Sequence, residues 1–256
     1  MVLTVNGHVV DESPRDIRTF IRSHSYLKET ASTLLSTSTK VVGPVGLVYV
    51  MQREFAATIP HDKNVTLIGT EDVTTCLVVI LRHTGSGATA LGHFDTAAHH
   101  EGIRMMVQRV QELSIGYPEG RIEATLIGAF SDPKGVSDEV IAGVLWPEMA
   151  LRHARIFTGE HAMLESYDPN LGLLRIGPFN YEPMRGVDLW LEQNDDFIRQ
   201  HLSSSPEVEP PGFATQTRMA LKHIQEHPFP LVTVFPDNKP HFYRKDESGS
   251  WVQVRY

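Results

Sequence analysis

The residues best able to do chemistry lie in one stretch, TTCLVVILRHTGSGATALGHFD, which holds the only cysteine of the 256-residue chain. Cys76 stands at the head of one apolar run, and His93 lies near the end of the next. A thiolate beside an imidazole attacks acyl and amide carbons, and the imidazole then protonates the leaving group. A free cysteine can equally be a small hydrophobic residue of the core. The choice depends on whether His93 lies close to Cys76 in space.

The pattern around these two residues predicts an antiparallel β-hairpin. Two runs rich in Val, Ile, Leu and Thr flank HTGSG, which is typical of a tight turn. If the turn centres on Gly85 and Ser86, His93 lies opposite Val78, and Val78 shares a face with Cys76 because side chains alternate along a strand. The two residues would then be diagonal neighbours with backbones about 7–8 Å apart. A shift of one residue would place His93 on the opposite face.

Polar residues on either side of the hairpin could assist such a pair. Thr70 and Asp95 are candidates to orient the imidazole of His93. The acidic pair Glu71 and Asp72 could hold a cationic group of a substrate, although acidic loop residues are often only solvated.

The segment HFDTAAHHE, residues 93–101, offers imidazole and carboxylate groups that could bind a metal ion. It lacks the helix-borne H-E-x-x-H spacing of zinc hydrolases, so we expect no metal here. The GSG of the hairpin turn has neither Walker nor dinucleotide-binding spacing, and a turn explains its glycines. We expect no cofactor.

The composition is that of an ordinary globular protein, with 41% hydrophobic and 21% charged residues. A net charge of −8 argues against nucleic acid or an anionic membrane as the main partner. A single cysteine excludes an internal disulfide and thiolate-rich zinc sites, which fits a reducing compartment. The N-terminus does not have the pattern of a signal peptide, and no apolar run is long enough to span a membrane. We expect a soluble, intracellular protein.

Helical and strand patterns follow one another irregularly, which predicts an α+β protein with a largely antiparallel sheet. Residues 3–10, 172–179 and 231–254 are expected to form hairpins or strands with turns. Other strands are expected over 45–52, 64–69, 74–82, 88–94 and 121–132. Helices are expected over 13–36 with Ser13 as N-cap, and over 101–113, 137–145, 147–157, 187–202 and 214–227.

Several segments resemble the protein N-terminal asparagine amidohydrolase family: VGPVGLVYVMQRE, LIGTEDVTTC, VILRHTGSGAT, GHFD, FSD, LRIGPF and VDLWL. They occur in the family's order and cover most of the chain, with a nearly continuous match from Val42 to Asp95. The resemblance implies a cysteine-dependent enzyme that hydrolyses the side-chain amide of asparagine at the free N-terminus of proteins or peptides. Its product, N-terminal aspartate, would feed the N-degron pathway of ubiquitin-dependent proteolysis. The resemblance also implies one domain over residues 1–256, a layered α/β sandwich with a mainly antiparallel sheet. That sandwich is likened to cytotoxic necrotizing factors and chemotaxis receptor deamidases.

Carried over residue by residue, the resemblance implies a catalytic triad of Cys76, His93 and Thr70. A substrate with a free α-ammonium group brings a positive charge, for which a carboxylate is the natural partner. The candidate substrate-binding residues are Asp72, Asp95 and Thr75.

The chain departs from the family near residues 145–147, where a segment of several tens of strand-rich residues is missing. The departure implies reduced stability and an exposed sheet edge or apolar patch. It also leaves open a catalytically impaired form that binds protein N-termini or a partner without turnover. A metal-dependent hydrolase is a third alternative.

Overall fold

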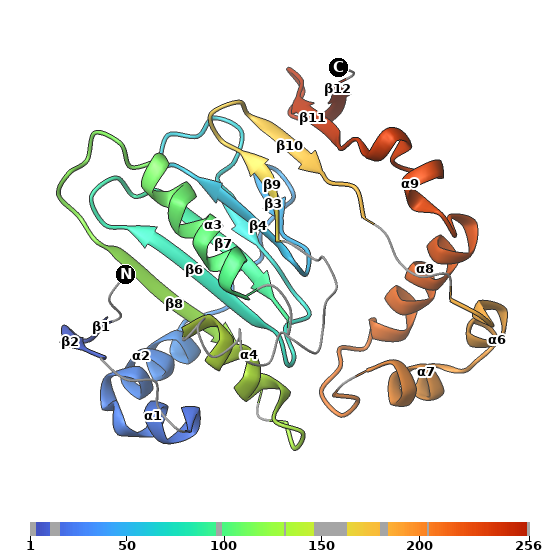
Figure 1. Cartoon of the computed structure of the whole chain (residues 1–256), viewed down its shortest axis with the longest axis horizontal. Helices are drawn as coiled ribbons and strands as arrows, with labels where there is room; N and C mark the ends of the chain where they lie inside the picture. The colour runs from blue at the N-terminus through green and yellow to red at the C-terminus, as the bar shows by residue number, and fades with distance from the viewer. Residues whose placement is uncertain are drawn as a thin grey trace.

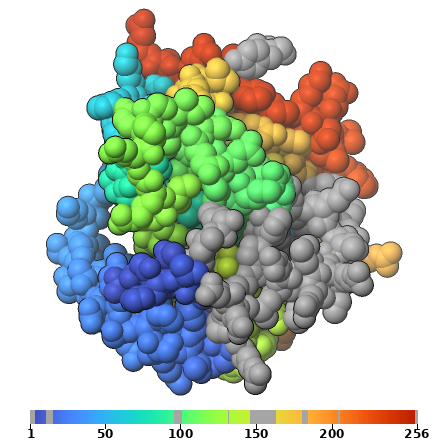
Figure 2. Space-filling model, turned by 60° about the vertical axis from the view of Figure 1, so that its left-hand side comes forward, coloured from blue at the N-terminus to red at the C-terminus, as the bar shows by residue number. Residues whose placement is uncertain are grey.

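The computed structural model describes residues 4–10, 16–95, 99–130, 132–145, 163–179, 184–203 and 205–254. These residues form an α+β fold, in which helices lie on and beside a large sheet (Figure 1). N-terminal residues gather at one end of the molecule and C-terminal residues at the other (Figure 2). No helix within these ranges is long and apolar enough to cross a membrane.

The large sheet has eight strands in the order β12-β11-β10-β9-β4-β7-β6-β8. β6 and β7 form a hairpin toward one side of the sheet, and β8 lies at that edge, paired with β6. The strands are β4 (Glu54–Thr58), β6 (Leu77–His83), β7 (Thr89–Phe94), β8 (Ile122–Gly128), β9 (Leu164–Asp168), β10 (Leu173–Ile176), β11 (His241–Lys245) and β12 (Trp251–Val254).

The sheet is mixed, which corrects the expectation of a mainly antiparallel one. β4 and β9 run parallel in its middle, and they join a half built from early residues to a half built from late ones. A second, two-stranded parallel sheet pairs β3 (Leu47–Tyr49) with β5 (Leu67–Gly69). Parallel pairs need long crossover connections, and the apolar pattern of a strand does not reveal the direction of its partner.

Hydrophobic side chains on the two faces of the sheet form separate cores. On one face, Leu77, Val79 and Phe94 pack with Met106 and Val110 of α3 (His99–Glu112). α4 (Val136–Leu145) adds to the same core. On the other face, the residues that pack together come from the large sheet and from the segments around β3 and β5; they include Val48, Val50, Val65, Val78, Leu91 and Tyr167.

Most predicted elements are present where the structure describes them. The Asn-Gly hairpin forms between β1 (Thr4–Val5) and β2 (His8–Val9), with both turn residues at positive φ. The expected helix over 187–202 divides into α6 (Val187–Leu191) and α7 (Asp195–Leu202). α8 (Phe213–Glu226) follows as predicted. The expected helix over 147–157 lies outside the described residues.

Two terminal segments differ from expectation. The first helix begins at Ile17 with Asp16 as N-cap and is broken at His24 into α1 (Ile17–Ser23) and α2 (Ser25–Ser36). The proposed cap Ser13 lies outside the described residues. Residues 231–234, expected as a strand, lie largely in the short helix α9 (Pro230–Thr233), because Pro230 occupies its first turn and favours helix initiation. The short 3₁₀ helix η2 (Pro236–Asn238) follows.

Candidate active site

The predicted register of the β6–β7 hairpin is confirmed. Val78 pairs with His93, and Leu77 pairs with Phe94. Cys76 is the bend residue immediately before β6, and strand alternation continued by one residue would put it on the face of Val78 and His93. This is the face covered by the β3–β5 sheet, because Val78 belongs to that core.

Thr70 comes to His93 from the small sheet. It directly follows β5, whose last residue, Gly69, accepts a hydrogen bond from the backbone N–H of Val50. The hydroxyl of Thr70 lies 2.8 Å from Nδ1 of His93, within hydrogen-bond distance. The imidazole is 4% exposed, and its Nε2 is buried and makes no hydrogen bond among the described residues. Nε2 is therefore the ring nitrogen left available for proton exchange.

The end of β8 holds the loop that carries Cys76. The N–H of Ala129 donates to the carbonyl of Cys76 at 2.7 Å, and the N–H of Phe130 donates to that of Thr74 at 2.9 Å. Gly128 has φ +106, and a Cβ on it would lie 2.8 Å from the carbonyl oxygen of Cys76. Only glycine fits that close approach without a shift of the loop.

Burial keeps both members of the Cys76–His93 pair uncharged near neutral pH. Burial is the largest effect on Cys76 and raises the pKa of its thiol to about 11, with the Asp95 carboxylate acting in the same direction. Burial also lowers the pKa of His93, against the opposite influence of Asp95 and Asp72. The resting pair is thus a thiol and a neutral imidazole.

Asp95 is engaged by its own neighbours. It is 7% exposed, and its Oδ2 accepts a hydrogen bond from Gln52 Nε2 at 2.8 Å. The same oxygen forms an ion pair with Arg53 Nε at 2.5 Å. These contacts make Asp95 a buried structural carboxylate next to the candidate nucleophile.

The other candidate binding residues have different environments. Asp72 is exposed and has a left-handed backbone with φ 56, whereas Thr75 is buried. Glu209, from the loop between α7 and α8, is near enough to raise the pKa of Cys76. Sequence patterns gave no signal for Glu209, Gln52 or Arg53, because only the tertiary structure brings them to Cys76.

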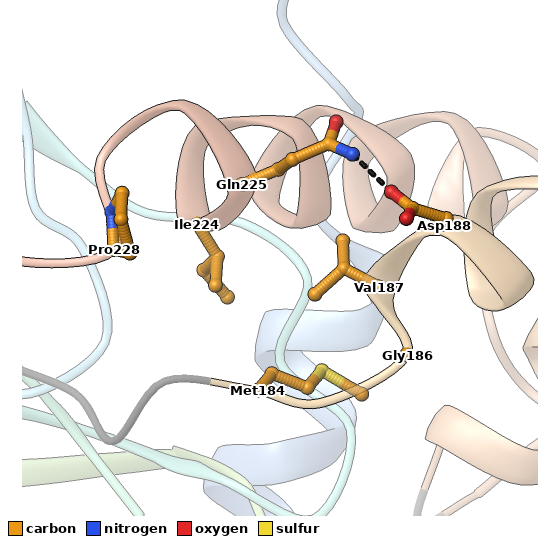
Figure 3. A pocket seen from close by; sticks show the side chains of 7 residues that line it. All are labelled: Met184, Gly186, Val187, Asp188, Ile224, Gln225 and Pro228. Carbon is orange, nitrogen blue, oxygen red and sulfur yellow. Dashed lines mark hydrogen bonds between the residues drawn. The ribbon is translucent and has the colours of Figure 1, made fainter.

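No group of three or more metal-binding side chains is found within the described ranges. The side chains of His99 and His100, considered above as ligands, lie outside what the structure describes. A separate cavity of about 300 Å³ lies between α6 and α8, lined by Met184, Val187 and Ile224 among others (Figure 3). None of the candidate catalytic residues lines it, so we base the active site on the chemistry of the Cys76 region.

The α+β fold joins the hydroxyl of Thr70 to the imidazole of His93, and Cys76 leads into the strand that pairs with the strand of His93. A thiol, an imidazole and a hydroxyl are the groups used by one class of hydrolases, which act through acyl transfer. Comparison with known proteins agrees with this class. The family model described as protein N-terminal asparagine amidohydrolase matches residues 37–146 and 143–253. The chain belongs to the protein N-terminal asparagine amidohydrolase family.

Relatives that carry this family name cover nearly the whole chain. The protein N-terminal asparagine amidohydrolase of Sus scrofa is 34% identical over 99% of this chain and 98% of the relative. The protein of the same name from Homo sapiens is 33% identical over the same shares. The one from Arabidopsis thaliana is 30% identical over 80% of each chain.

Proposed function

We propose that this chain hydrolyses the side-chain amide of asparagine at the N-terminus of a protein or peptide, through a thioester on Cys76. Membership of the family supports the reaction and the substrate. The single observation that supports the catalytic assignment is the hydrogen bond between Thr70 and Nδ1 of His93, a residue on the strand that pairs with the strand following Cys76.

The proposed chemistry begins from the uncharged pair. Nδ1–H of His93 donates to Thr70, so the free Nε2 can accept the thiol proton as sulfur attacks the carboxamide carbon. The C–N bond then breaks, and the imidazolium protonates the departing ammonia, which leaves a thioester. Water attacks the thioester and gives a proton to Nε2, and the C–S bond breaks as Cys76 recovers its proton. One water is consumed and one ammonia is released for each carboxylate formed.

The reaction can be tested with a peptide that begins with asparagine. We expect release of ammonia and the small mass gain of an amide converted to an acid. Cys76→Ala should abolish turnover, because no other residue of the chain carries a thiol. A peptide that begins with glutamine and a peptide with internal asparagine are the matched controls. Turnover that persists in Cys76→Ala, or that EDTA abolishes, would contradict the cysteine mechanism.

An absence of turnover in the wild-type chain would favour the alternative, a form that binds protein N-termini without cleaving the amide. A binding measurement with the same asparagine peptide then tells whether recognition remains. Under the main proposal the product begins with aspartate and enters the N-degron pathway in the cytoplasm or the nucleus. Kinship with the cytotoxic necrotizing factor and chemotaxis receptor deamidase folds also stays a prediction.

Asp72 is the better candidate to bind the α-ammonium group of the substrate. It is exposed beside the nucleophile loop, whereas Asp95 is buried and already paired with Arg53. We expect Asp72→Asn to raise KM roughly 5- to 20-fold with little change in kcat, the size of one charge-assisted hydrogen bond. Asparagine tolerates the left-handed backbone of this position, so the fold should persist. An unchanged KM for both Asp72→Asn and Asp95→Asn would show that the ammonium is bound elsewhere.

A further inference from the structure

Arg53 stands at the start of β4 and takes no part in the reaction written above. Its φ is +65, in the left-handed region that residues other than glycine rarely adopt. The neighbouring elements maintain this conformation through both backbone groups. The N–H of Arg53 donates to the carbonyl of His93 at 2.8 Å, and its own carbonyl accepts from the N–H of Leu164 at 3.0 Å.

The side chain of Arg53 contacts Asp95, whose carboxylate influences the pKa of Cys76. Its Nε lies 2.5 Å from Oδ2 of Asp95, the oxygen that also accepts from Gln52. The carboxylate is almost fully buried, so without the guanidinium it would be a poorly compensated negative charge beside Cys76. Arg53 therefore contacts both the backbone of His93, the proposed base, and the carboxylate of Asp95, which influences the pKa of Cys76.

The charges around the pair have opposite effects on the thiol. The Asp95 and Glu209 carboxylates raise the pKa of Cys76, and the Arg53 guanidinium lowers it. On His93, the carboxylates of Asp95 and Asp72 raise the pKa, although burial outweighs them.

We propose that Arg53 is a positioning residue of the reaction: it fixes the His93 backbone and neutralises Asp95, so that Cys76 can lose its proton to His93. This inference rests on the proposed role of Cys76 as the nucleophile. Asp95 belongs to the same arrangement, because its negative charge is the one that Arg53 neutralises.

The test follows the reactivity of Cys76 without substrate. The chain has one cysteine, so alkylation by iodoacetamide, followed by mass spectrometry, reports only that thiol. Alkylation needs the thiolate, and its rate against pH therefore gives the ionisation profile. In Arg53→Gln, which removes the ion pair to Asp95, we expect alkylation at about pH 8 to be roughly three- to tenfold slower and the profile to move to higher pH. Arg53→Lys should restore part of the rate.

Asp95→Asn provides the complementary change. It should move the profile to lower pH, and the double variant Arg53→Gln/Asp95→Asn should return close to the wild-type profile. A purely structural role would make the double variant at least as perturbed as the single ones. Arg18→Gln is the matched control, because Arg18 is similarly exposed (41% against 37%) and pairs through Nε with a carboxylate, Asp138, on α4. Its profile should equal that of the wild type.

Superimposable profiles for wild type, Arg53→Gln and Asp95→Asn would overturn the proposal. If circular dichroism shows that Arg53→Gln is unfolded, Arg53→Lys and Asp95→Asn alone decide it, and an unmoved Asp95→Asn profile overturns it. With the asparagine peptide, we expect Arg53→Gln to lower kcat more than it raises KM. A wild-type chain without turnover contradicts the proposed function, whereas the alkylation profiles test Arg53 independently of turnover.

Discussion

At the scale of residues, the proposed site would combine a thiol whose pKa is raised by burial with an imidazole whose pKa is lowered by burial. Thiolate is scarce at neutral pH in such a pair, so attack by sulfur needs transfer of the thiol proton. That transfer then depends on the orientation of His93, whose Nδ1 contacts Thr70. In the proposed mechanism, Thr70 accepts from Nδ1–H and so leaves Nε2 as the nitrogen that acts as the base.

We expect Thr70→Ala to lower kcat by roughly 10- to 100-fold, the cost of one lost hydrogen bond to a buried group expressed as a rate. KM should change little, because Thr70 acts on His93 and not on the substrate. Thr70→Ser keeps the hydroxyl and should retain most of the activity. Steady-state kinetics with the asparagine peptide measure both variants, and equal losses in Ala and Ser would argue against the orienting hydrogen bond.

At the scale of elements, the loop of Cys76 depends on the last residues of β8. Backbone hydrogen bonds from Ala129 and Phe130 hold this loop, and Gly128 packs against the carbonyl of Cys76. The position of Cys76 thus depends on β8, although about fifty residues separate the two in the sequence.

Gly128→Ala should displace the Cys76 loop. The new Cβ would lie 2.5 Å from Cγ1 of Val73 and 2.8 Å from the Cys76 carbonyl, at a φ that alanine disfavours. We expect a loss of about 1–3 kcal/mol in the free energy of unfolding and a larger relative loss of kcat. Gly116→Ala is the control, because Gly116 has a similar φ of +94 but nothing within 4 Å of its Cβ position. Equal effects of the two substitutions on kcat would show that the backbone conformation alone is responsible.

At the scale of the whole molecule, β8 is the last strand of the large sheet and pairs only with β6 in the described part of the chain. Its backbone groups on the outer side form a sheet edge of the kind that promotes association with other chains. Two findings from the comparison with relatives concern the origin of this exposed edge. The family model matches in two stretches that meet at residues 143–146, and the alignment with the porcine relative spans 307 positions, more than the 256 residues of this chain.

We propose that this chain lacks a family segment near residues 145–147 and is less stable for that reason. Inserting the corresponding porcine residues between Leu145 and Pro147 should raise Tm by several degrees, because more apolar surface would be buried. A Gly/Ser insert of the same length is the control, and it should leave Tm unchanged or lower. Thermal unfolding followed by circular dichroism measures all three, and a chimera that melts with the parent would contradict the proposal.

The local pattern of the sequence determined the β6–β7 hairpin, and with it the pairing of Val78 with His93. A Gly-rich turn between two apolar runs sets its own register, since the pairing involves only neighbouring residues. The helices α3, α4 and α8 were equally predictable from their spacing of apolar residues. β4 was not, because Phe55, Ala56 and Ala57 are all buried and two of them are alanine, so neither alternation nor β propensity marks the strand.

Only the tertiary structure decided which groups surround the hairpin. The parallel pairing of β4 with β9, the hydrogen bond of Thr70 to His93 and the ion pair of Arg53 with Asp95 join residues about 20 to 110 positions apart. Such contacts depend on how two cores pack on opposite faces of one sheet, and the periodicity of a segment carries no information about its distant partners. The sequence alone could therefore predict the candidate nucleophile and base, whereas only the packing of the tertiary structure showed which side chains surround them.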